Sequence, residues 1–106
     1  MAEFWVKRND VGGTISTTLS DATGPVDLTG ATVAFHLGRA GQPALVSAAA
    51  TVTNAAGGVV SYTWAAGDTD TEGDWQAEWE VTFPSGEVRT FPNDGYDTVH
   101  IRADLA

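Results

Sequence analysis

The chain of 106 residues contains no cysteine and only five lysine or arginine side chains. Without cysteine there is no disulfide, no thiolate nucleophile and no cysteine-based zinc site. The basic residues are scattered along a sequence whose net charge is −9. Binding to a phosphate backbone or to an anionic membrane needs clustered cations. We therefore expect neither nucleic-acid binding nor membrane binding.

Long apolar runs are also missing. No run approaches the ~20 apolar residues that a helix needs to cross a bilayer. The first residues lack the basic-then-apolar pattern of a signal peptide, which predicts folding in a cytosol. What is present suffices for one core: 42% of the residues are hydrophobic, four of them tryptophan. A chain of this length predicts a single domain spanning residues 1–106.

Polarity alternates from one residue to the next, most clearly over residues 74–83. Trp75 and Trp79 fall on one face of this segment, and Glu78 and Glu80 fall on the other. Because side chains i and i+2 share a face only in a strand, the pattern predicts a β-strand with one apolar and one acidic face. A helix would scatter the aromatic residues around its circumference.

The same pattern recurs along the chain, separated by glycine, proline and asparagine turns. Residues 43–50 are alanine-rich and compatible with a helical turn, but the following β-branched residues favour a strand. The sequence predicts an all-β fold, an immunoglobulin-like antiparallel β-sandwich of about seven or eight strands. Segments 4–7 and 14–19 are the expected edge strands. The further predicted strands are residues 31–37, 58–64, 88–91 and 98–102.

An acidic loop over residues 68–73 supplies weak candidates for metal ligands, namely Asp68, Asp70 and Glu72. Oxygen ligands at alternate positions followed by glycine match the first half of an EF-hand loop. The match fails at the twelfth position, which is Trp79 instead of a bidentate glutamate. A turn is the favoured interpretation over a calcium site, and we expect neither a metal nor a cofactor.

The same segment has a second interpretation. Asp70, Gly73, Trp75 and Ala77 are similar to the Asp-x-x-Gly-x-Tyr-x-Ala corner of immunoglobulin-like domains. Tryptophan stands where tyrosine is usual. Its indole N–H can donate one hydrogen bond to a nearby carbonyl, so the corner remains chemically feasible.

Catalytic patterns are weak. His36 and His100 each lie opposite the apolar residues of a predicted strand, and two histidines without a third ligand make a poor metal site. No Gly-x-Ser-x-Gly turn, phosphate-binding glycine loop or dinucleotide fingerprint occurs. Glu78 and Glu80 share a face that we expect to be solvated. We therefore predict that the chain is not an enzyme and has no catalytic residues.

Four tryptophans raise the question of sugar binding, but alternation directs Trp64, Trp75 and Trp79 into the core. Trp5 differs, because it follows Phe4 directly and one of the two must face outward in a strand. An outward aromatic side chain in a terminal edge strand is a candidate contact for a neighbouring protein. The interaction candidates are Phe4, Trp5 and Lys7.

Several motifs together resemble the N-terminal immunoglobulin-like domain of phage baseplate upper proteins. Residues 24–35 are similar to that family's G-x-P-V-D-L-T-G-A-x-V-x-F signature, and residues 68–79 to its D-T-x-x-x-G-x-Y-x-A-E-W stretch. Each motif is mostly turn chemistry and alternation, and their order and spacing are the more specific signal. Further similar segments are residues 4–10 (F-x-V-K-R-x-D), 57–64 (G-x-V-x-Y-x-W), 91–96 (F-P-x-x-G-Y) and 101–105.

The resemblance implies a structural protein of a bacteriophage virion, a tail or baseplate module for assembly or host attachment. The implied partners are other virion proteins or further copies of the chain, with a host-surface glycan as another candidate. The implied location is the virion, after synthesis in the host bacterial cytoplasm. Two alternatives stay open on the same fold, a capsid decoration protein and a carbohydrate-binding module.

Overall fold

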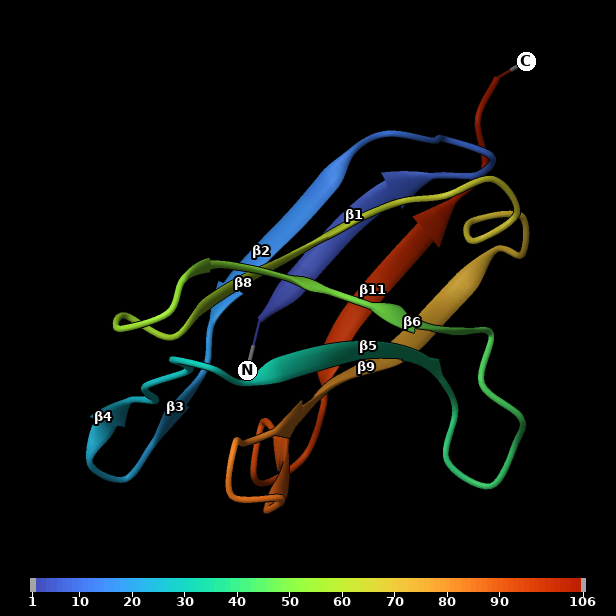
Figure 1. Ribbon diagram of the computed structural model, residues 1–106. Coiled ribbons are helices and arrows are strands. Elements are labelled where there is room, and N and C mark those ends of the chain that lie inside the picture. Colours follow the sequence, from blue (N-terminus) through green and yellow to red (C-terminus); the bar gives the residue numbers. More distant parts are fainter. Residues whose placement is uncertain (1, 106) are drawn as a thin grey trace.

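A computed structural model describes residues 2–105, and the chain forms strands joined by turns and loops (Figure 1). Within residues 2–105, the structure contains no helical segment of the length and hydropathy that a bilayer crossing requires. The strands in chain order are β1 (Glu3–Lys7), β2 (Thr14–Thr18), β3 (Ser20–Asp21), β4 (Gly24–Pro25), β5 (Thr32–Gly38), β6 (Val46–Ala49), β7 (Thr51–Asn54), β8 (Val59–Thr63), β9 (Gly73–Thr82), β10 (Val88–Phe91) and β11 (Asp97–Arg102).

Two sheets form the layers of a sandwich. The larger one has the order β1-β11-β9-β5-β6, with β10 also paired to β9, and the smaller one has the order β2-β8-β7. The short β3 and β4 pair with each other. The predicted all-β sandwich is therefore confirmed. Its pairing is antiparallel apart from β1, which runs parallel to β11.

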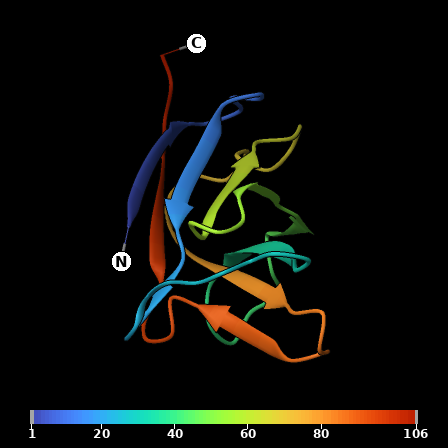
Figure 2. The same cartoon turned by 60° about the vertical axis from the view of Figure 1, so that its left-hand side comes forward.

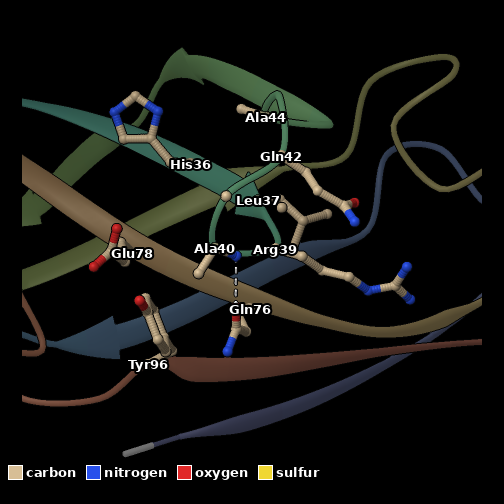
Figure 3. A pocket seen from close by; sticks show the side chains of 11 residues that line it. His36, Leu37, Arg39, Ala40, Gln42, Ala44, Gln76, Glu78 and Tyr96 are labelled. Atoms are coloured by element: carbon tan, nitrogen blue, oxygen red, sulfur yellow. Dashed lines mark hydrogen bonds between the residues drawn. The ribbon is translucent and has the colours of Figure 1, made fainter.

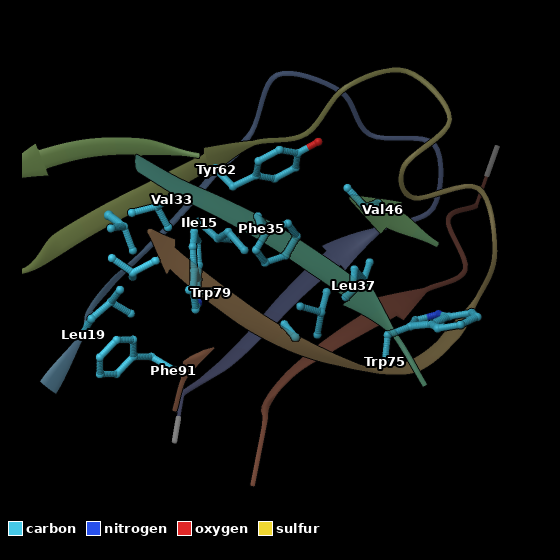
Figure 4. Close-up of a cluster of buried hydrophobic side chains, with 14 of the residues drawn as sticks. Ile15, Leu19, Val33, Phe35, Leu37, Val46, Tyr62, Trp75, Trp79 and Phe91 are labelled. Atoms are coloured by element: carbon cyan, nitrogen blue, oxygen red, sulfur yellow. The ribbon is translucent and has the colours of Figure 1, made fainter. Parts of the chain in front are cut away.

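The core lies between the two sheets and is built on aromatic side chains (Figure 4). Phe35 of β5 stacks on Tyr62 of β8 at 4.6 Å between ring centroids and lies 4.7 Å from Trp79 of β9. Trp64 meets Phe35 edge-on at 5.9 Å. Such pairs add roughly 0.5–1.5 kcal/mol each beyond the burial of their area. Alternation in β9 thus predicted the correct inward face, with Trp79 and Trp75 both buried.

The described residues form eleven strands instead of the predicted seven or eight, because the ambiguous segment divides in two and the short β3 and β4 form between β2 and β5. Chain direction changes at Ala50, between β6 of the larger sheet and β7 of the smaller sheet. Ala50 donates its N–H to the Val33 carbonyl at 2.9 Å. Small side chains here let the chain cross between layers, so the alanine-rich composition marks a crossover and not a helix.

The corner before β9 forms as the sequence indicates. The indole Nε1 of Trp75 donates to the Thr71 carbonyl oxygen at 3.1 Å. This bond ties the start of β9 to the preceding loop, which is the role expected for the corner tyrosine of immunoglobulin-like domains. The guanidinium of Arg39 covers the outer ring face of Trp75 at 3.9 Å from the ring centroid.

One glycine is required by close backbone approach. Gly58 has a φ of +71°, and a Cβ there would come within 2.8 Å of the Leu19 and Val26 carbonyl oxygens. Its own carbonyl accepts the Leu19 N–H at 2.8 Å. Glycine is the residue that meets both conditions, because it adopts positive φ without steric cost. It joins β8 to the segment after β2 and closes that end of the smaller sheet.

Candidate functional site

The main candidate site is a groove between two open strand edges of the sandwich, those of β1 and β2; β6 and β7 form the opposite ends of the two sheets. β1 ends the order of the larger sheet and β2 ends that of the smaller sheet, and the two lie side by side on one flank of the molecule (Figure 2). The space between them has a volume of about 690 Å³. We call it the edge groove and define it by Trp5, Val6, Lys7, Val11, Ile15 and Trp64.

The edge groove has a buried floor and an exposed apolar rim. Trp64 and Ile15 belong to the core and form the floor, where their side chains are 2% and 7% exposed. Trp5 and Val11 stand on the rim with 63% and 60% exposure. Large apolar side chains that are open to water above an apolar floor are typical of an interaction surface.

Basic residues that are scattered in the sequence gather at this flank. Lys7 of β1 is the register partner of Arg102 of β11, and the Arg8 N–H donates to the Arg102 carbonyl at 2.7 Å. Three of the chain's five basic residues therefore meet here, because β1 pairs with the last strand. This clustering corrects the expectation of dispersed cations. Asp10 also lines the groove, so its charge is mixed.

The three cations are not equally engaged. Arg102 Nη1 lies 2.9 Å from Asp74 Oδ1, and Arg8 Nη1 lies 3.8 Å from Glu72 Oε1. Lys7 Nζ contacts the Ala103 carbonyl oxygen at 3.4 Å. Within residues 2–105, no carboxylate lies at ion-pair distance from it. The Lys7 ammonium is consequently the cation at the groove that is most available to a ligand.

The Trp5 ring packs against a histidine of the neighbouring strand β11. Its ring stacks on His100 with 4.8 Å between centroids. His100 Nδ1 lies 2.7 Å from Asp74 Oδ1, and its Nε2 lies 3.0 Å from Glu3 Oε1. The hydrogen bonds that Asp74 and then Glu3 accept from His100 raise the pKa of His100, and the bonds that Asp74 accepts from His100 and Arg102 lower the pKa of Asp74. This cluster fixes the orientation of the indole.

The interaction candidates from the sequence separate into two groups. Trp5 and Lys7 point outward on the same face of β1, as the alternation predicts. Phe4 points the other way and packs against the core. Phe4 is partly buried and supports β1 from inside, and its role as a contact residue stays a prediction.

The three weak metal candidates are directed to different partners. Asp68 Oδ2 accepts from the Tyr62 hydroxyl at 2.6 Å and from the Ala65 N–H at 2.8 Å. Asp70 accepts from its neighbour Thr71, and Glu72 pairs with Arg8. No group of three His, Asp or Glu side chains able to hold a metal ion occurs within residues 2–105.

The acidic loop instead braces the segment beside the edge groove. The Thr69 carbonyl accepts the Asn9 N–H at 3.1 Å, and the Thr69 hydroxyl donates to the Asp10 carbonyl at 3.0 Å. Thr69 is almost completely buried. The loop thus holds the connection between β1 and β2, a long-range role that local sequence patterns do not reveal.

A polar pocket lies on the outer face of the larger sheet, under the loop after β5 (Figure 3). Near it, Ser47 Oγ lies 3.1 Å from His36 Nδ1, and His36 Nε2 lies 4.0 Å from Glu80 Oε1. Serine, histidine and glutamate in a row suggest a hydrolase, but the second distance exceeds a hydrogen bond. The row also crosses three neighbouring strands, β6, β5 and β9, and the backbone of β5 at its centre is paired on both sides.

No protein-family model and no curated protein matches the chain. Among solved structures, the chain is similar to the crystal structure of CopC from Methylosinus trichosporium OB3b. The TM-score is 0.55 at 9% sequence identity, over 100% of this chain and 89% of that one. A likeness at this identity establishes the β-sandwich fold alone.

The comparison corrects the predicted function. The solved structure that the chain resembles is CopC and not a virion protein, and no family model or curated protein supports a tail, baseplate or capsid role, so that prediction is not retained. The underlying resemblance to baseplate upper proteins is not tested by any matching family and stays a prediction.

Proposed function

We propose that this chain is a non-enzymatic binding domain whose edge groove takes an apolar protein segment that also carries acidic side chains. The observation that carries the proposal is the pairing of exposed Trp5 and Val11 above the buried floor.

Exposed apolar side chains are concentrated at this groove. Within residues 2–105, four large hydrophobic side chains are strongly exposed: Trp5, Val11, Val88 and Leu105. Two of them line the edge groove, and one of these is tryptophan. Tryptophan is enriched among the residues that dominate binding energy, because its large rigid ring loses little conformational entropy when a partner covers it.

Charge selects the partner. The chain as a whole carries −9, so its surface repels an acidic ligand at long range. At the edge groove the Lys7 ammonium stands beside the apolar rim, and no carboxylate among residues 2–105 pairs with it. An acidic side chain on the partner would find its attractive position here, which fixes orientation more than it adds affinity.

The test uses nuclear magnetic resonance titration of the isotope-labelled chain with pools of short synthetic peptides. The pools are apolar-acidic, apolar-basic and uncharged polar. We expect the apolar-acidic pool to shift the Trp5 indole resonance and the amides of Val11 and Ile15 most strongly. Trp5→Ala should weaken this binding by about tenfold or more, as expected for a central contact residue. Lys7→Glu should reverse the preference for acidic over basic pools.

Val88→Ala is the matched control. Val88 is exposed to a similar degree at 54% but lies on β10, away from the edge groove. Its removal should leave peptide binding unchanged. Equal binding by the wild type and Trp5→Ala, or shifts centred on β10, would contradict the proposal.

A further inference from the structure

We infer, on the basis of the proposed function, that the partner binds as an extended strand added to the free edge of β1, with apolar and acidic side chains in alternation. The partner class is therefore a β-strand-forming polypeptide segment. Strand addition supplies main-chain hydrogen bonds for affinity, while alternate side chains supply specificity.

The pairing of β1 with β11 shows which backbone groups are used. The Thr98 N–H donates to the Ala2 carbonyl at 2.9 Å, and the Arg8 N–H donates to the Arg102 carbonyl at 2.7 Å. Because N–H and C=O of successive strand residues point to opposite edges, the even-numbered residues of β1 face β11. The backbone groups of Glu3, Trp5 and Lys7 therefore point to the open edge.

One of these groups already has a partner. The Lys7 carbonyl accepts the Asp10 N–H at 3.2 Å in the turn after β1. Both groups of Glu3, both groups of Trp5 and the N–H of Lys7 are left directed toward the open edge. The same residues carry their side chains on the outer face. A strand that pairs here thus runs directly beside the Trp5 indole.

The two faces of the added strand meet different surroundings. Its inward side chains enter the edge groove and contact Val6, Ile15 and Trp64, so they should be apolar. Its outward side chains pass Glu3, Trp5 and Lys7. The Glu3 carboxylate lies 3.0 Å from His100 Nε2, and an acidic group of the added strand meets the available ammonium at Lys7. An alternating apolar and acidic segment satisfies both faces.

The open edge of β2 is the weaker acceptor. The Leu19 N–H donates to the Gly58 carbonyl, so the backbone groups of odd-numbered residues point toward β8. By the same alternation, the backbone groups of Thr14, Ser16 and Thr18 point to the open edge of β2. Their side chains are short and polar. The Ser16 hydroxyl is bonded back to the Val60 carbonyl at 3.0 Å. No aromatic side chain or cation of β2 would accompany an added strand.

The experiment uses the full chain and a synthetic peptide of alternating valine and glutamate as the probe. Two variants of the peptide are N-methylated, one at every glutamate and the other at every valine. Each variant lacks N–H groups along one edge only, so one blocks pairing with β1 and the other serves as its matched control. We expect one to lose about tenfold or more in affinity and the other to bind like the parent.

Which of the two methylated peptides loses affinity also shows whether the added strand runs antiparallel or parallel to β1. In an antiparallel pair, the residue opposite Trp5 shares its outer face and turns its own N–H toward β1, so methylated glutamates would block binding. In a parallel pair, the inward residues on either side of that position turn their N–H groups toward β1, so methylated valines would block binding. Either result supports the added strand. Hydrogen exchange of the Trp5 amide should slow in the complex, since a free-edge N–H becomes bonded.

Distinct outcomes overturn the inference. If both methylated peptides bind like the parent while Trp5→Ala still abolishes binding, the proposed function stands and the added strand is wrong. If Trp5→Ala and both methylations leave binding unchanged, both proposals fail. Slowed exchange at Ser16 instead of Trp5 would place the strand on β2. Concentration-dependent dimers with Trp5 protection in the absence of peptide would identify a second copy as the occupant.

Discussion

The interior around Trp79 and the open edge around Trp5 show what one residue type does in two places. Trp79 lies in the middle of β9 and is fully buried, with its Nε1 donating to Asp97 at 3.2 Å. Trp5 lies on an edge strand and is 63% exposed, with a ring that stacks on His100. Both occupy regular alternating positions of their strands.

The difference arises from the number of neighbouring elements. β9 is flanked by β5 on one side and by β10 and β11 on the other, and the smaller sheet covers its inner face. β1 has β11 on one side and the edge groove on the other. A central tryptophan stabilises the fold, whereas an edge tryptophan is available for binding. The four predictions below test this division.

Trp79→Ala should have the largest effect on stability. Removing a fully buried indole between Phe35 and Phe91 should lower the free energy of unfolding by about 3–5 kcal/mol. Urea unfolding followed by far-ultraviolet circular dichroism would measure it. Trp79→Phe, which keeps an aromatic ring, should recover part of the loss. A change below roughly 1 kcal/mol would contradict the assignment of Trp79 to a tightly packed core.

Asp97→Ala should come next, because Asp97 links the interior to the edge. Its carboxylate accepts from Trp79 Nε1 and, at 2.8 Å, from the Ala2 N–H. Without it the buried indole N–H has no partner, which should cost about 1–3 kcal/mol in the same urea measurement. Asp94→Ala, at an exposed position of the preceding turn, is the control and should stay within roughly 0.5 kcal/mol of the wild type.

Trp5→Ala should behave in the opposite way to Trp79→Ala. Losing the stacking on His100 should lower stability by no more than roughly 1 kcal/mol. The same variant should lose most peptide binding in the titration described above. Unfolding of the chain on Trp5→Ala would show that the edge tryptophan belongs to the structural core, and the comparison would fail.

The smallest expected effect is a pH dependence confined to the edge. The pKa of His100 is raised above 6.5, so its stabilisation is complete below pH 6.5 and is lost as pH rises through the raised value. The pKa of Asp74 is lowered below 3.8, so its stabilisation is present above pH 3.8 and is lost as pH falls through the lowered value. Both contributions are therefore present between pH 3.8 and 6.5.

His100→Gln should remove the contribution of His100 to the pH dependence of stability, because glutamine is polar but does not titrate. Urea midpoints of the wild type and the variant should differ more near about pH 5 than near about pH 9. In an Asp74→Asn background, the His100→Gln substitution should change the urea midpoint by a similar amount at both pH values. A gap between wild type and variant that is independent of pH would contradict the ion-pair interpretation of the cluster.

The sequence by itself determined the layers and the faces of the strands. Alternation over residues 74–83 identified the inward tryptophans, and the spacing of Asp70, Gly73 and Trp75 identified the corner whose indole N–H bonds to a backbone carbonyl. It also named Phe4, Trp5 and Lys7 as contact candidates, since one of the neighbouring Phe4 and Trp5 must face outward in a strand. These features follow from local geometry, because a strand repeats every two residues and a turn depends on a few adjacent ones.

Only the tertiary structure decided where the edge groove lies and what surrounds it. Parallel pairing of β1 with β11 joins residues about a hundred positions apart, which brings Lys7 to Arg102 and places His100 under Trp5. The same pairing turns Phe4 inward and leaves the backbone of Trp5 open. No local pattern encodes such contacts, since register between distant strands is set by the packing of the whole sandwich.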